Sequence, residues 1–164
     1  MFREMRRANQ QLTHEECQAI LKNATAGVLS LLGDGGYPYG VPLSHAYADG
    51  KLYFHGAKTG HKIDAIRGCE KASFCVIDRD EVRSKELTTY FRSVIAFGKV
   101  ELLEGEEMLS AVNTLARRFF PAIPEGWEAR YQNSLDNMYM IVLTVEHLTG
   151  KEAIELTRAR TQNQ

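Results

Sequence analysis

The chain has 164 residues, of which 44% are hydrophobic and 25% are charged, with a formal net charge of −1. This is the composition of a globular protein that can bury a core, and the near-zero charge argues against nucleic acid or an anionic membrane as a partner. No apolar run approaches the roughly 20 residues that span a bilayer. The three cysteines form no Cys-x-x-Cys pair and no hydrophobic signal region follows the basic N-terminus, which predicts a cytoplasmic protein.

The first elements follow one another closely. A helix is predicted over residues 13–23, because Thr13 and Glu16 form a capping box at its start. Apolar runs and turn residues then predict three strands and a second helix, which ends at Gly68: strands 26–32, 39–47 and 51–55, with an Asp-Gly turn before the third, and helix 61–67.

The second half of the chain is predicted to hold longer elements. Gly98 is a candidate β-bulge in one of them. The order is strand 71–78, a solvated charged loop over 79–86, strand 88–103, amphipathic helix 104–120, a short helix over 125–136 and a last strand over 137–148.

Six strands, mostly in hairpin order, with few and short helices do not fit a parallel sheet covered by helices on both faces. The pattern favours a mainly β protein with some helix, in which an antiparallel six-stranded sheet curls into a barrel. We expect one domain over residues 1–164, with the helices 13–23 and 104–120 packed outside the barrel.

The connection between the third strand and the second helix contains more histidines, lysines and glycines than a turn between two elements needs. Gly60, His61 and Lys62 open the helix, where unpaired backbone amides and the helix dipole attract anions. Glycine allows close approach of an anion, and lysine adds a full charge, so the segment is equipped to bind phosphate. A solvated helix end with a loosely packed histidine is the alternative.

The neighbouring strands place further groups beside this segment. Alternation along residues 51–55 turns His55 away from Leu52 and Phe54, toward the phosphate segment. Pro42 lacks an amide hydrogen, so its strand is interrupted or lies at an edge, where free backbone groups can bond a flat heterocycle. His45, His55 and His61 match no known ligand spacing, and no metal site is predicted.

At this point the residues resemble a known family. The run "GDGGYPYGVPLSHAYADGKLYFHGAKTGHKIDAIR" is similar to the flavin-binding half of the pyridoxamine 5′-phosphate oxidase-like split β-barrels. With "FREMRR", "TTYFRSVIAFGKV" and "EHLTGKEAIEL", the chain resembles more narrowly the 5-nitroimidazole resistance (Nim) proteins of that superfamily. The resemblance implies FMN as the cofactor, held at the interface of a homodimer.

The resemblance also implies roles for individual residues. The isoalloxazine ring would lie along one strand, largely against backbone groups, at Val41, Pro42, Leu43, Ser44 and His45. The ring and ribityl chain would be lined by His55, Gly56 and Ala57, and the phosphate would be bound by Gly60, His61 and Lys62. Ser93 stands where the oxidase branch carries a glutamine that reaches the flavin, with Arg92 beside it.

The function that the resemblance implies is FMN-dependent reduction of 5-nitroimidazole-like or related small, flat heteroaromatic compounds. His55 would be catalytic, giving a hydrogen bond or a proton to the nitro or nitroso oxygen. The arginine that the oxidases carry at the position of His61 and their C-terminal substrate segment are missing, which argues against vitamin B6 oxidation.

Two features of the function stay open at this point. No Gly-x-Gly-x-x-Gly motif is present, so the reductant binds elsewhere on the chain or electrons arrive through a partner, a separate electron donor or reductase. The alternatives to a reductase are a flavin-binding or redox-sensing protein without turnover, and a split barrel that binds haem through a histidine.

Overall fold

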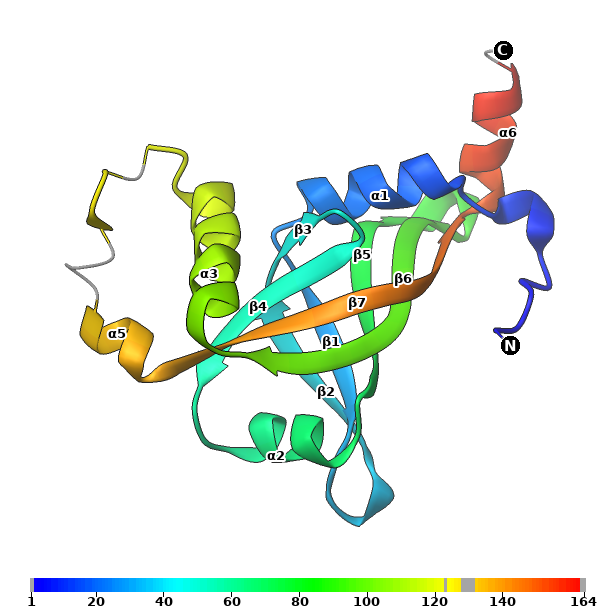
Figure 1. Cartoon of the computed structure of the whole chain (residues 1–164). Helices are drawn as coiled ribbons and strands as arrows, with labels where there is room; N and C mark the ends of the chain where they lie inside the picture. Colours follow the sequence, from blue (N-terminus) through cyan, green and yellow to red (C-terminus); the bar gives the residue numbers. More distant parts are fainter. Residues whose placement is uncertain (1, 123, 128–131, 163–164) are drawn as a thin grey trace.

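The computed structural model describes residues 2–122, 124–127 and 132–162. Its strands form one antiparallel sheet in the order β2-β1-β5-β6-β7-β4-β3, which curls around a central core (Figure 1). The strands are β1 (Ala26–Leu32), β2 (Pro38–Ser44), β3 (Ala46–Ala48), β4 (Lys51–Ala57), β5 (Lys71–Arg83), β6 (Thr88–Leu103) and β7 (Met138–Glu152). The antiparallel, mainly β architecture is therefore confirmed.

The prediction of six strands was wrong, because the segment 39–47 supplies two strands instead of one. β2 pairs with β1 at one edge of the sheet, whereas β3 pairs with β4 at the other edge. The chain crosses from one edge to the other at His45, whose amide donates to the carbonyl of Thr25. The described sheet therefore has seven strands, and β2 and β3 are its edges.

The helices pack at different places around the sheet. Figure 1 shows α1 and α2 at opposite ends of the curled sheet, with α3 beside it. Their bounds are α1 (His14–Asn23), α2 (His61–Gly68), α3 (Gly105–Phe119), α5 (Gln132–Asp136) and α6 (Ile154–Gln162). The capping box of α1 and the helix after Gly60 are confirmed. No described helix is long and apolar enough to cross a membrane.

Two apolar clusters show which side of the sheet each helix packs against. α1 contributes Cys17, Ile20 and Leu21 to the main core inside the sheet, and α2 contributes to the same core. α3 instead packs on a second cluster with Met140 and Val142, which alternate along β7 with core residues. Thus α3 lies outside the sheet, whereas α1 closes one end of the core.

The charged run 79–86 was predicted to be a loop, and this was wrong. β5 continues through it to Arg83, and only three residues, Ser84–Glu86, form a 3₁₀ turn. Arg79 and Arg83 both pair with Glu81, and both guanidinium groups lie over the ring of Tyr90 on β6, at 5.6 and 5.1 Å from its centroid. Cross-strand contacts of this kind stabilise a hairpin whose charges face solvent.

Three other features concern the bulge in β6 and the elements near the end of the chain. The predicted bulge at Gly98 is confirmed by a shift of register between β6 and β7, and a Cβ built there would lie 1.9 Å from the carbonyl oxygen of Thr144. β7 runs four residues beyond the predicted end, and α6 was not predicted. The predicted helix 125–136 falls partly outside the described residues, and α5 is its described part.

Candidate functional site

The start of α2 presents free hydrogen-bond donors. Gly60 adopts φ 115°, a conformation that favours glycine, and its carbonyl accepts from the amides of Ile63 and Asp64. No hydrogen bond is formed by the amides of His61 and Lys62 within the described part of the chain. Two amides and the positive end of the helix therefore face outward at this point.

Lys62 adds an ammonium group that lacks a counter-charge. Its side chain crosses Gly56, where an added Cβ would come within 2.9 Å of both Cε and Nζ. Partial burial lowers the pKa of Lys62, because desolvation disfavours the charged form. Among the residues that the structure describes, no carboxylate lies within 4.0 Å of it. A bound anion would offset the free-energy cost of keeping the partly buried ammonium of Lys62 charged.

The imidazole of His61 is engaged elsewhere. It stacks on Tyr39, with ring centroids 4.1 Å apart, and its Nε2 accepts from the amide of Asp34 at 3.3 Å. His61 thus ties α2 to the turn between β1 and β2. In this conformation the backbone amide of His61 is the group available to a phosphate. Binding of a phosphate by its imidazole stays a prediction.

Three residues that the sequence did not single out lie beside Lys62. Tyr139 of β7 stands opposite Gly56 in the β4–β7 pairing. The ammonium of Lys58 lies 5.7 Å from the centroid of its ring, and the guanidinium carbon of Arg67 lies 5.8 Å from it. The signal available in the sequence was the spacing of Lys58, Lys62 and Arg67 around one short helix.

His55 lies on the other face of β4. Leu52, Phe54 and Gly56 are buried, whereas His55 and Ala57 are exposed, so the predicted alternation is confirmed. His55 is paired in register with Met140 of the outer apolar cluster. The side chains of His55 and Lys62 therefore project from opposite faces of the strand end that both adjoin.

The β2 segment matches its prediction in part. β2 is an edge strand, which confirms the inference drawn from Pro42. Pro42 and Ser44 are exposed on its outer side, whereas Val41 and Leu43 pack against the main core. The outward backbone of this edge remains the candidate for contact with a flat ring.

His45, predicted beside the same ring, has a side chain that is fully buried. Its Nε2 lies 2.9 Å from the carbonyl oxygen of Leu21, and its ring meets Phe74 edge-on. Burial lowers the pKa of His45, which favours the neutral imidazole. The crossing from β2 to β3 turns this side chain inward, so only its backbone can contribute to an exposed site.

Arg92 and Ser93 do not join the other predicted residues. Arg92 forms ion pairs with Asp78 and Glu152, and Ser93 is paired with Ile77 and Lys151. Along β7, the partner of His55 is Met140 and the partner of Arg92 is Glu152. These positions are separated by roughly 40 Å of strand at 3.3 Å per residue. One chain alone does not unite the two groups.

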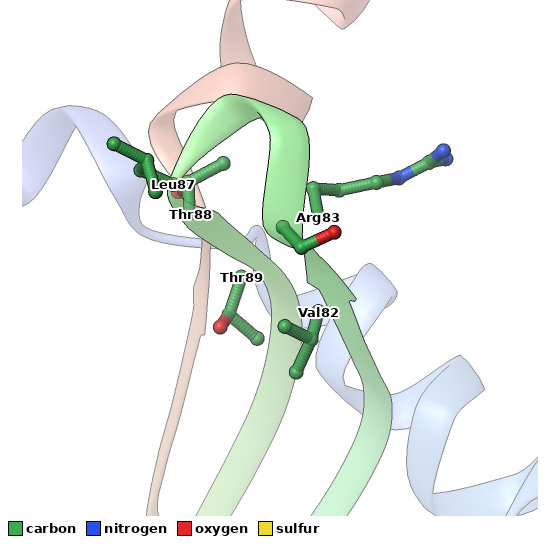
Figure 2. A pocket seen from close by; sticks show the side chains of 6 residues that line it. Val82, Arg83, Leu87, Thr88 and Thr89 are labelled. Atoms are coloured by element: carbon green, nitrogen blue, oxygen red, sulfur yellow. The ribbon is translucent and has the colours of Figure 1, made fainter.

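A depression of about 300 Å³ lies at the tip of the β5–β6 hairpin (Figure 2), lined by Val82, Arg83, Ser84, Leu87, Thr88 and Thr89. It contains none of the predicted site residues, and Figure 2 shows its labelled side chains on the two strand ends at the tip of the hairpin. No cluster of three His, Cys, Asp or Glu side chains suited to a metal ion is found in the described ranges.

Comparison with known proteins points to one family. A family model described as pyridoxamine 5′-phosphate oxidase matches residues 13–152. A protein described as a 5-nitroimidazole antibiotic resistance protein from Bacteroides thetaiotaomicron shares 21% identity at a TM-score of 0.74, covering 87% of this chain and 86% of that one.

Two further solved structures are similar. A FAD-binding protein from Mesorhizobium loti shares 26% identity at a TM-score of 0.64, over 87% of this chain and 96% of that one. A FAD- and haem-binding protein from Mycobacterium smegmatis shares 21% identity at a TM-score of 0.73, over 88% and 73%. No curated protein matches the chain significantly.

Proposed function

The chain belongs to the pyridoxamine 5′-phosphate oxidase family, and from that premise we propose that it binds a flavin and reduces small, flat heteroaromatic compounds. The observation that carries the proposal is the start of α2, which presents two amides without a hydrogen bond after Gly60 and the unpaired ammonium of Lys62 against Gly56. This is a site for the flavin phosphate. The similar proteins from M. loti and M. smegmatis, which bind FAD, support a flavin.

The cofactor is proposed at the level of the flavin mononucleotide unit, which FMN and FAD share. Its bound ring supplies the electron chemistry, while the protein binds and orients it. We place the phosphate at Gly60–Lys62 and the ring along the open edge of β2, at Pro42 and Ser44. Because the chain lacks a dinucleotide-binding glycine motif, the reductant either binds elsewhere on the chain or passes electrons through a partner.

His55 is the proposed catalytic residue. Its imidazole is exposed and forms no hydrogen bond within the described part of the chain, so it can turn toward a substrate. A nitroaromatic gains negative charge on its oxygens as electrons arrive, and an imidazole can donate a hydrogen bond or proton there at neutral pH. The similarity to the 5-nitroimidazole resistance protein supports this substrate class.

The flavin site is tested with Lys62→Ala. Loss of one charge-assisted contact, worth roughly 1.5–3 kcal/mol, should weaken flavin binding by about ten- to a hundredfold without unfolding the protein. Flavin absorbance of the purified wild type and titration of the flavin-free forms would measure this. The exposed Lys51, at the other end of β4, provides the control Lys51→Ala. An unchanged dissociation constant in Lys62→Ala would remove Lys62 from the site, and a Soret band in the wild type would favour haem.

We further propose a homodimer that completes the site. Across the outer face of the sheet, Pro42, Val28, Cys75 and Ile95 stand in one row over four strands. Val28 and Ile77 are 39% and 69% exposed on this face, a large cost for branched apolar side chains in water. A second copy packed here would cover them and bring its own Ser93, which is paired with Ile77 on this face, toward the first copy.

Sedimentation of the flavin-loaded protein at micromolar concentration should therefore give a dimer. Ile77→Lys, which places a charge on the same exposed face, should shift the equilibrium toward the monomer without loss of the fold, because nothing in the core is altered. A flavin-loaded wild-type monomer would contradict the proposal.

A further inference from the structure

The basic residues around Tyr139 exceed what one phosphate at the start of α2 requires. Lys58 and Arg67 both lie within 6 Å of the centroid of this ring, and Arg67 also donates from Nη2 to the tyrosine hydroxyl at 3.4 Å. Tyr139 is paired with Gly56, the residue that Lys62 crosses. Two groups of cations therefore adjoin the same strand pair, one at the helix start and one at the tyrosine.

Nothing in the described part of the chain neutralises this second group. Lys58 and Arg67 form no ion pair with a carboxylate. Asp64, on the first turn of α2, is exposed and unpaired, and Asp34 lies 3.8 Å from His61. Four other arginines of the described chain, Arg79, Arg83, Arg92 and Arg160, do have carboxylate partners.

The chemistry of the second group suits a phosphate. A guanidinium offers a planar fork of donors that matches phosphate oxygens, and a lysine supplies a mobile point charge. The tyrosine ring holds both cations near one place by cation–π attraction. Apart from the bond from Nη2 of Arg67 to the tyrosine hydroxyl, their donors form no hydrogen bond within the described part of the chain. Full solvation of two surface cations is the competing explanation, and it predicts no preference among phosphate ligands.

We propose that Lys58, Arg67 and Tyr139 form a second phosphate subsite next to Lys62, so that the site takes the diphosphate of flavin adenine dinucleotide in preference to the single phosphate of FMN. This inference rests on the proposed flavin site and specifies the form of its cofactor. Lys62 and the amides of α2 then hold the phosphate nearer the flavin, and the second subsite holds the one nearer the adenosine.

The test compares FAD and FMN by calorimetric titration of the flavin-free protein. Wild type should bind FAD at least about ten times more tightly than FMN. The double variant Lys58→Gln/Arg67→Gln should lose about tenfold or more in affinity for FAD, and less than about threefold for FMN. The matched control Lys22→Gln/Lys51→Gln removes two exposed charges elsewhere and should change neither. Lys62→Ala should weaken both ligands.

Other outcomes decide against the inference in distinguishable ways. Wild type that prefers FMN, or a double variant that weakens both flavins equally, would overturn the second subsite while the flavin proposal stands. Absence of binding by either flavin would overturn both proposals. ADP-ribose carries the diphosphate without a flavin: binding as tight as that of FAD, and lost in the double variant, would assign the subsite to another dinucleotide and overturn the preference for FAD.

Discussion

Replacing His55 with phenylalanine is expected to leave flavin binding intact and to slow the reduction of a 5-nitroimidazole by about 10²–10⁴-fold. His55 is exposed at the end of β4 and contributes nothing to either apolar cluster, so the fold should tolerate the change. Phenylalanine keeps a flat ring but cannot donate to a developing oxyanion. The measurement is anaerobic stopped-flow mixing of pre-reduced protein with the nitro compound, which isolates this half-reaction from the unknown electron donor.

Two further variants sharpen this result. His55→Gln can donate a hydrogen bond but cannot deliver a proton at neutral pH, so its rate separates the two roles. His14→Phe changes a histidine on the first turn of α1, away from the strand end, and should retain the wild-type rate. If His55→Phe carried full flavin and reoxidised at the wild-type rate, His55 would be a lining residue only.

Local signals in the sequence predicted most of the elements, and long-range pairing explains the misses. The capping box at Thr13, the turn before β4 and the bulge at Gly98 act over a few residues and were each confirmed. The break at His45 depends on β1 and β4 lying at distant places in the sheet order, which no window around residue 45 contains. The run 79–86 looked like a loop because it is highly charged, but its charges pair with one another along β5 and its arginines lie over Tyr90 of β6.

The residues of the candidate site also separate into those that local signals predicted and those whose positions depend on tertiary contacts. The glycine-led start of α2 and the outward face of His55 follow from helix-end chemistry and strand alternation, so the sequence sufficed. Tyr139 was missed because it meets Lys58 and Arg67 only through the pairing of β4 with β7, some eighty positions later in the chain. The inward turn of His45 and the pairing of Arg92 with two carboxylates likewise depend on tertiary contacts.

Removing the carboxylate of Glu152 is expected to destabilise the fold by about 1–3 kcal/mol, out of the roughly 5–15 kcal/mol of a typical domain. Glu152 is only 1% exposed, and it accepts from Arg92 at 3.3 Å and from Thr157 at 3.2 Å. It also pairs with Arg160 of α6. The Nε of Arg92 is already buried without a partner, and in Glu152→Ala the guanidinium, whose side chain is 36% exposed, would keep only its ion pair with Asp78. Urea unfolding would measure the loss.

Glu81 offers a matched control, because it too pairs with two arginines, Arg79 and Arg83, but on the solvent side of the hairpin. Glu81→Ala should shift the unfolding midpoint only slightly, since water screens exposed pairs. If Glu81→Ala and Glu152→Ala lowered the free energy of unfolding by equally small amounts, the burial of Glu152 would not make its ion pairs important for stability. Glu152→Gln retains the shape and should fall between wild type and Glu152→Ala. A large loss in Glu152→Ala alone would show that the buried carboxylate, shared by Arg92, Arg160 and Thr157, holds β6, β7 and α6 together.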